Sequence, residues 1–282
     1  MNSRKGSLER VAVGIASMFG IYWIYACFLQ DYLQISDSAK KLIGLFSLYG
    51  VGLAVFMCIL KKVPTQKYVR RKASLKTIML CFLLQFTAIM VLSVMVNILT
   101  ILGLMENSVN INATSPYSLL MLLVFNPIIE EMVFRKLFAD KLLQYGELFF
   151  MLASSFCFAL VHGVSLGIPQ IIYTFLLGMI WSYLLVKTGD IRLVIIMHAL
   201  SNLFGSVIIQ ALFRVSMILA GLYSMLLMAL GATGAVLFCV YKKKVSLDGE
   251  ERFWRKDVWK DILTNRGILF YIVLTIFMMV AA

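Results

Sequence analysis

The sequence is poor in charged residues. Only 14% of its 282 residues are Asp, Glu, Lys or Arg, whereas a typical soluble domain contains about 25%. Hydrophobic residues make up 61% of the chain, and the mean hydropathy is +0.91. A chain of this composition cannot cover itself with a water-compatible surface, which excludes a soluble globular domain.

The sequence also lacks the patterns of two other protein classes. Its net charge is +12, but the basic residues lie in the gaps between apolar runs and form no basic, aromatic-interleaved surface, which excludes nucleic acid as a partner. The five cysteines lie inside apolar runs, and no two have metal-ligand spacing. We therefore interpret the cysteines as small buried hydrophobic residues.

Long apolar runs dominate the rest of the chain. A helix needs about 20 apolar residues to cross the hydrocarbon layer, and eight or nine runs approach or exceed that length. We therefore predict an all-α fold, a polytopic membrane helix bundle with eight or nine transmembrane helices and membrane lipids around it. The expected spans are roughly 10–29, 42–60, 77–103, 117–138, 148–164, 168–187, 192–212, 216–241 and 267–281.

The positions of the basic residues predict the orientation. If the N-terminus is cytoplasmic and all nine spans are used, 23 of the 26 Lys and Arg residues fall on the cytoplasmic side. Such a bias over short loops is the positive-inside rule, so we expect a cytoplasmic N-terminus.

No repeat or linker divides the sequence, so we expect residues 1–282 to form one integral membrane domain. Residues 245–266 stand apart as an amphipathic segment. Trp254, Val258 and Ile262 follow each other at intervals of four, which predicts a helix lying in the cytoplasmic interface of the membrane.

Three of the expected spans contain ionisable residues away from their ends. A charge at the bilayer centre costs about 2.5–3.5 kcal/mol on insertion scales, and such groups usually face a bundle interior or a wet cavity. The fourth, fifth and seventh spans each carry this cost, which indicates a functional site. The residues are Glu130, Glu131 and Arg135, then His162, then His198 and Asn202.

Helical geometry separates the roles of these residues. At about 100° per residue, Glu131 and Arg135 lie only about 40° apart and can pair along one face, whereas Glu130 points elsewhere. We expect the pair to neutralise itself, as a structural ion pair or as support for a site, and Glu130 to face a cavity. His198 and Asn202 share a four-residue spacing and project towards one point; either one could instead serve as an interhelical hydrogen bond.

The same spacing places Phe158 one turn before His162, where its ring could hold the imidazole. With this pair, three ordered motifs are present, and together they resemble the CPBP family, which includes type II CAAX prenyl endopeptidases and the bacterial bacteriocin-processing or immunity proteins called Abi. The resemblance covers roughly 117–205, which we take as the catalytic core. The motifs are EExxxR (Glu130, Glu131, Arg135), FxxxH (Phe158, His162) and HxxxN (His198, Asn202).

The resemblance implies an intramembrane endopeptidase that cleaves a membrane-associated peptide or protein, in CAAX-like processing, peptide maturation or bacteriocin immunity. It implies that Glu130 and His162 activate water, that His198 and Asn202 stabilise the oxyanion, and that the remaining motif residues support them. Such a protein is expected in the bacterial plasma membrane as a multi-pass protein.

The cofactor remains open at this point. A glutamate and two histidines (Glu130, His162, His198) match the ligand set of some catalytic zinc sites, but the sequence lacks H-E-x-x-H, and a metal-free site is the alternative. Two other functions also fit: a non-catalytic immunity or scaffold protein of the same fold, and a proton-coupled transporter, since intramembrane Glu and His also form proton relays.

Overall fold

The computed structural model describes residues 3–69, 74–105, 115–242, 245–247 and 255–281, and these residues form helices with no strand among them. Eight helices in this part of the chain are long and apolar enough to cross a membrane, or nine if the bent pair α12 (Lys256–Leu263) and α13 (Arg266–Ala281) counts as one span. The predicted all-α polytopic fold is therefore confirmed. The chain divides into two compact units, which we describe separately.

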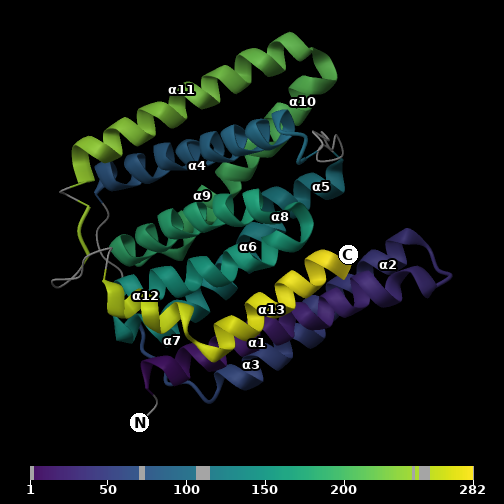
Figure 1. Cartoon of the computed structure of the whole chain (residues 1–282), viewed down its shortest axis with the longest axis vertical. Helices are drawn as coiled ribbons and strands as arrows, with labels where there is room; N and C mark the ends of the chain where they lie inside the picture. Colours follow the sequence, from purple (N-terminus) through teal and green to yellow (C-terminus); the bar gives the residue numbers. More distant parts are fainter. Residues whose placement is uncertain (1–2, 70–73, 106–114, 243–244, 248–254, 282) are drawn as a thin grey trace. The chain divides into compact units, whose positions relative to one another are not determined.

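The first unit contains Met1–Lys67, Phe138–Ile171 and Glu251–Ala282. In this unit α1 packs against both α3 and α13 (Figure 1). The helix bounds are α1 (Arg4–Ile24), α2 (Asp37–Leu45), α3 (Leu53–Leu60), α7 (Phe138–Leu142), the beginning of α8 (Glu147–Thr188), α12 (Lys256–Leu263) and α13 (Arg266–Ala281).

Close backbone approach joins α13 to α1. A Cβ added at Gly267 would lie 2.5 Å from the carbonyl oxygen of Glu9, so only glycine fits there. The side chain of Asn265 donates to the Lys5 carbonyl at 2.9 Å and accepts from the Gly267 amide at 3.0 Å. The start of α13 is thus fixed against the start of α1.

The amphipathic helix α12 turns its apolar stripe towards protein. Val258 and Ile262 are each only 1% exposed, so these two residues of the stripe are buried in the protein. Its charged face pairs with α1 through Asp261, which binds Arg4 and lies 3.1 Å from the Nζ of Lys5. The third residue of the predicted stripe, Trp254, lies outside the described residues.

The second unit contains Tyr68–Leu137 and Ile172–Glu250. Several of its α-helices continue directly into single π-helical turns, labelled η, in which the hydrogen bonds run from residue i+5 to residue i. The bounds are α4 (Leu75–Ile101), α5 (Pro116–Leu120), η5 (Met121–Phe125), α6 (Asn126–Glu131), η6 (Met132–Leu137), the end of α8, α9 (Ile191–Asn202), η8 (Leu203–Val207), α10 (Ile208–Val215) and α11 (Met217–Tyr241).

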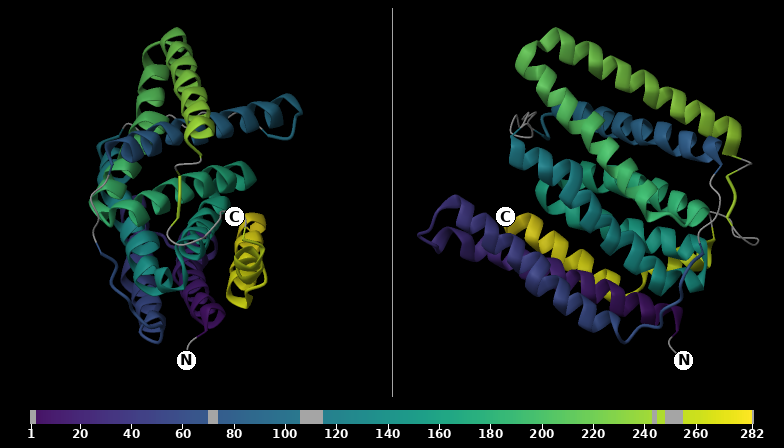
Figure 2. Two further views of the ribbon diagram at one scale, coloured as in Figure 1. Left: turned by 90° about the vertical axis from the view of Figure 1, so that its left-hand side faces the viewer. Right: turned by 180° about the vertical axis from the view of Figure 1, so that it is seen from behind.

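Two glycines bring α11 against α4, and the two helices run side by side in Figure 1 and in the right-hand view of Figure 2. A Cβ added at Gly231 or Gly234 would lie 2.7 or 2.6 Å from a backbone carbonyl of α4. Thr87 uses this closeness to donate to the Gly231 carbonyl at 2.8 Å. Small residues at helix contacts are the usual means by which membrane helices approach closely.

The long helix α8 is broken at Gly167. This glycine has φ 72° and ψ −159°, a backbone conformation that a residue with a Cβ rarely adopts. Pro169 follows in the first turn after the break, where its missing N–H is tolerated. The break separates the fifth and sixth spans at the place where the sequence predicts a gap between 164 and 168.

Candidate active site

The buried charge of the second unit lies where α6 passes into η6. Arg135 Nε lies 3.1 Å from Glu131 Oε2, and both side chains are fully buried. This is the pair that the four-residue spacing predicts. Because opposite charges that leave water must compensate each other, the Glu131 carboxylate and the guanidinium depend on each other for their burial.

Glu131 has a second partner that its helical direction does not predict. Its Oε1 lies 2.9 Å from Nδ1 of His198 on α9, so the two carboxylate oxygens bind two different side chains. A carboxylate paired with Arg135 can only accept, and therefore Nδ1 of His198 donates. This bond fixes the orientation of the imidazole.

The other ring nitrogen of His198 faces Glu130. Nε2 lies 3.8 Å from Glu130 Oε2, and the Glu130 side chain is 19% exposed whereas that of Glu131 is fully buried. The two neighbouring glutamates were expected to point in different directions. They differ in exposure, and Glu130 is the more accessible of the two. Both nevertheless reach the same imidazole from opposite sides.

Two residues that the sequence did not single out for the site complete this cluster. The Trp181 ring stacks on His198 with centroids 4.2 Å apart and an interplanar angle of 22°. The Arg135 guanidinium carbon lies 5.3 Å from the centre of the same indole ring. Trp181 is held in turn by Gln85 on α4, whose side-chain oxygen accepts from the indole N–H at 2.9 Å.

The sequence carried only a weak sign of these two residues. Gln85 is a polar residue in an apolar span, and a buried indole requires an acceptor for its N–H, but nothing in the spacing of residues on α4, α8 and α9 connects them. Gln85 also donates to the sulfur of Met197, one residue before His198, at 3.5 Å.

Asn202 binds a carbonyl that the chain itself leaves without a helical donor. In η5, the Asn126 N–H bonds to Met121 instead of Leu122. The i+5 donor for Leu122 would be residue 127, which is a proline and has no N–H. Asn202 Nδ2 donates to the Leu122 carbonyl at 2.8 Å and so ties α9 to η5. An amide has two N–H groups, and this bond requires only one of them.

His162 belongs to the first unit. Its Nδ1 lies 2.8 Å from the carbonyl oxygen of Phe158, one turn earlier, and therefore donates to it. The two rings are 4.5 Å apart, and the Phe158 side chain is buried. The pair thus has the contact that its spacing predicts, and the backbone bond leaves Nε2 as the nitrogen that carries the lone pair when the ring is neutral.

The donor set of the second unit fits a metal ion only in part. Within either unit, no group of three His, Cys, Asp or Glu side chains among the described residues could hold a metal. Glu130 and His198 could supply two ligands, and a carboxylate on Nδ1 is the usual support of a metal-binding histidine. Catalytic zinc sites, however, take three protein ligands, and the third residue of the predicted set, His162, belongs to the first unit.

Together, the apolar helices and the charged cluster buried among them define an integral, multi-pass membrane protein. Residues 112–204 match the family model described as Rce1-like: Type II CAAX prenyl endopeptidase Rce1-like. The match includes every residue of the three motifs. It confirms the resemblance to the CPBP family that these motifs indicated. This family implies a protease with a peptide or protein substrate in the membrane. Comparison with curated proteins and with solved structures found no match.

Proposed function

We propose that this chain is an intramembrane endopeptidase that hydrolyses a peptide bond in a membrane-associated protein or peptide. The observation that supports this most directly is the imidazole of His198 between two carboxylates: Glu131 on Nδ1 at 2.9 Å and the more exposed Glu130 at 3.8 Å from Nε2. The first carboxylate orients the ring, and the side chain of the second is 19% exposed.

The proposed reaction begins with water beside Glu130. The carboxylate accepts a proton as the water oxygen attacks the scissile carbonyl carbon, and this proton later passes to the leaving amine. Following the resemblance, His162 assists in activating the water. A protonated Nε2 of His198 and the second N–H of Asn202 donate to the oxyanion as it forms. Arg135 and Glu131 act through His198 by holding it in place.

The decisive experiment is cleavage by the purified protein in proteoliposomes. A peptide library with and without a C-terminal prenylated cysteine would be incubated with the wild type, and the products would be identified by mass spectrometry. We expect specific products from the wild type, and at least about 100-fold slower formation of these products upon Glu130→Gln. Treatment with a zinc chelator, followed by zinc addition, separates the two chemistries: reversible loss of cleavage indicates a metal, and unchanged cleavage indicates a metal-free site.

We expect Trp181 to act as a positioning residue in this reaction. Trp181→Leu removes the ring stacked on His198 and should lower kcat by up to about 100-fold, because small displacements of a catalytic group are that costly. Trp181→Phe keeps a stacked ring and should lose less. The measurement is the pH profile of kcat, which should change in Trp181→Leu with KM nearly constant.

The matched control for Trp181 is Trp23, which is also buried and stacks on Tyr271 in the first unit. Trp23→Leu should lower stability without changing the pH profile. If Trp181→Leu kept the wild-type profile and kcat, the indole would have only a packing role.

A further inference from the structure

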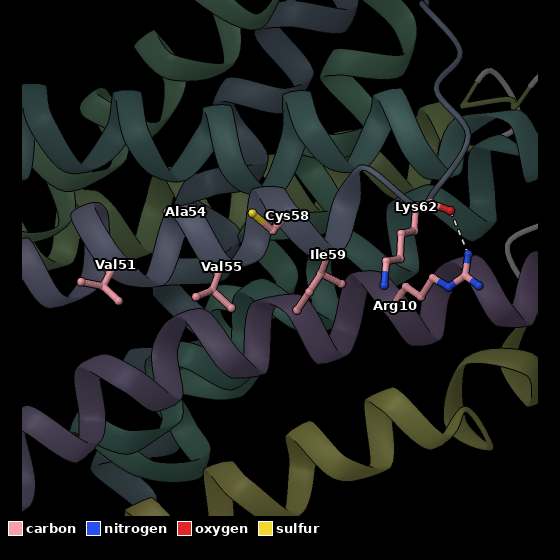
Figure 3. A pocket seen from close by; sticks show the side chains of 7 residues that line it. All are labelled: Arg10, Val51, Ala54, Val55, Cys58, Ile59 and Lys62. Carbon is pink, nitrogen blue, oxygen red and sulfur yellow. Dashed lines mark hydrogen bonds between the residues drawn. The ribbon is translucent and has the colours of Figure 1, made fainter.

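A groove on the first unit combines an apolar wall with a basic end. Its volume is about 610 Å³. Figure 3 shows Val51, Val55 and Ile59 along η3 (Phe46–Gly52) and α3, and Arg10 on the neighbouring helix α1. The complete lining is Arg10, Val51, Ala54, Val55, Cys58, Ile59 and Lys62.

The apolar lining residues form one helix face. Their spacing of three or four residues from Val51 to Ile59 places them in a row, with Lys62 one turn further along. The row from Val51 to Lys62 is about 16 Å long at the helical rise per residue. This is about half of the roughly 30 Å hydrocarbon thickness of a bilayer, which is the depth of one leaflet.

The two cations lie together at the same end of this row. The Arg10 guanidinium donates to the Lys62 carbonyl oxygen at 2.8 Å, and both residues are solvent-exposed. This bond holds the guanidinium at the end of the groove. Among the described residues, no acidic one lines the groove, so its basic end is complementary to an anion.

We propose that this groove binds an anionic glycerophospholipid, with the phosphate between Arg10 and Lys62 and one acyl chain along α3. The length of the row from Val51 to Lys62 matches the distance from the headgroup level to the middle of the bilayer. Both charged lining residues lie at one end of the groove, and the rest of the lining is apolar. This arrangement favours a lipid over a peptide helix, because a peptide helix would require polar partners along its length. The Lys and Arg bias predicts that this is the cytoplasmic leaflet.

The test is native mass spectrometry of the detergent-purified full chain with added phosphatidylglycerol, phosphatidylcholine or inorganic phosphate. We expect the wild type to retain phosphatidylglycerol in preference to phosphatidylcholine. Arg10→Gln with Lys62→Gln should weaken phosphatidylglycerol binding about 25-fold, because each cation near a lipid headgroup contributes about five-fold. Lys61→Gln removes the same charge one residue away, outside the groove, and should leave binding unchanged.

A second pair of variants tests the acyl chain without changing any charge. Ala54→Trp fills the groove and should abolish the bound lipid, whereas Met57→Trp, on an exposed position of α3 outside the lining, should not. Lipid binding that is equal in Ala54→Trp and Met57→Trp would overturn the proposal. So would a double Gln variant with wild-type preference for phosphatidylglycerol, or inorganic phosphate that displaces the lipid at equal concentration.

Discussion

Replacing Glu130 with glutamine is expected to lower kcat/KM for peptide cleavage by about 100- to 10,000-fold, the range that a general base contributes. The amide has nearly the shape of the carboxylate but cannot accept the proton of the attacking water. Glu131, Arg135 and His198 keep their mutual contacts in this variant, so the protein should remain folded. The measurement is cleavage of the best library peptide in proteoliposomes, with thermal unfolding recorded on the same samples.

The control for Glu130→Gln is Glu9→Gln, which removes a carboxylate from α1 in the first unit and should cleave at the wild-type rate. Turnover by Glu130→Gln within a few-fold of the wild type would remove Glu130 as the base. Two other outcomes point to the rival functions. Immunity that survives both Glu130→Gln and His198→Ala would indicate a non-catalytic protein, and flux that depends on a pH gradient would indicate a transporter.

Replacing Arg135 with methionine is expected to destabilise the protein by about 3–5 kcal/mol, because it leaves the Glu131 carboxylate buried without its counter-ion. Both side chains are fully buried, 3.1 Å apart, so water cannot take the place of the guanidinium. The loss of the contact between Arg135 and the Trp181 ring adds to the effect. The free energy of unfolding can be measured by titration with a denaturing detergent.

A double variant separates the structural role of this ion pair from its role in positioning. Arg135→Met combined with Glu131→Gln removes both charges and should recover much of the lost stability, because the buried pair as a whole contributes less than either charge left alone costs. Cleavage should not recover, since a neutral amide binds His198 Nδ1 less strongly than a carboxylate does. Recovery of both properties would show that the pair serves the fold alone.

The helices and the ion pair could be predicted because both follow from local periodicity. Hydropathy runs locate the spans, and the four-residue spacing of Glu131 and Arg135 is enough to place them on one helix face. The bond between Glu131 and His198 could not be predicted in this way. A helical wheel gives a side chain one direction, whereas a carboxylate on a flexible stem offers two oxygens and can serve two partners.

The residues that hold the cluster in place could not be predicted from the sequence, because they depend on tertiary contacts. Trp181 and Gln85 come from α8 and α4, and no sequence pattern relates positions on different helices. The Leu122 carbonyl bound by Asn202 depends on a π turn meeting Pro127, and the same sequence is equally typical of a simple proline kink. Which backbone groups lack a helical partner, and which side chains then reach them, is decided by the folded chain.

The contact between Gln85 and Trp181 also shows which parts of the chain must accompany the motif segment. Residues 112–204 contain all three motifs, but Gln85 lies outside them on α4, and the glycines of α11 seat α4 in turn. A motif segment that is excised or transplanted would therefore keep His198 and its two carboxylates but lose Gln85, the hydrogen-bond acceptor of the Trp181 indole. Chimeras designed to exchange substrate preference within this protein class should therefore transfer the third and eighth spans, α4 and α11, together with the motifs.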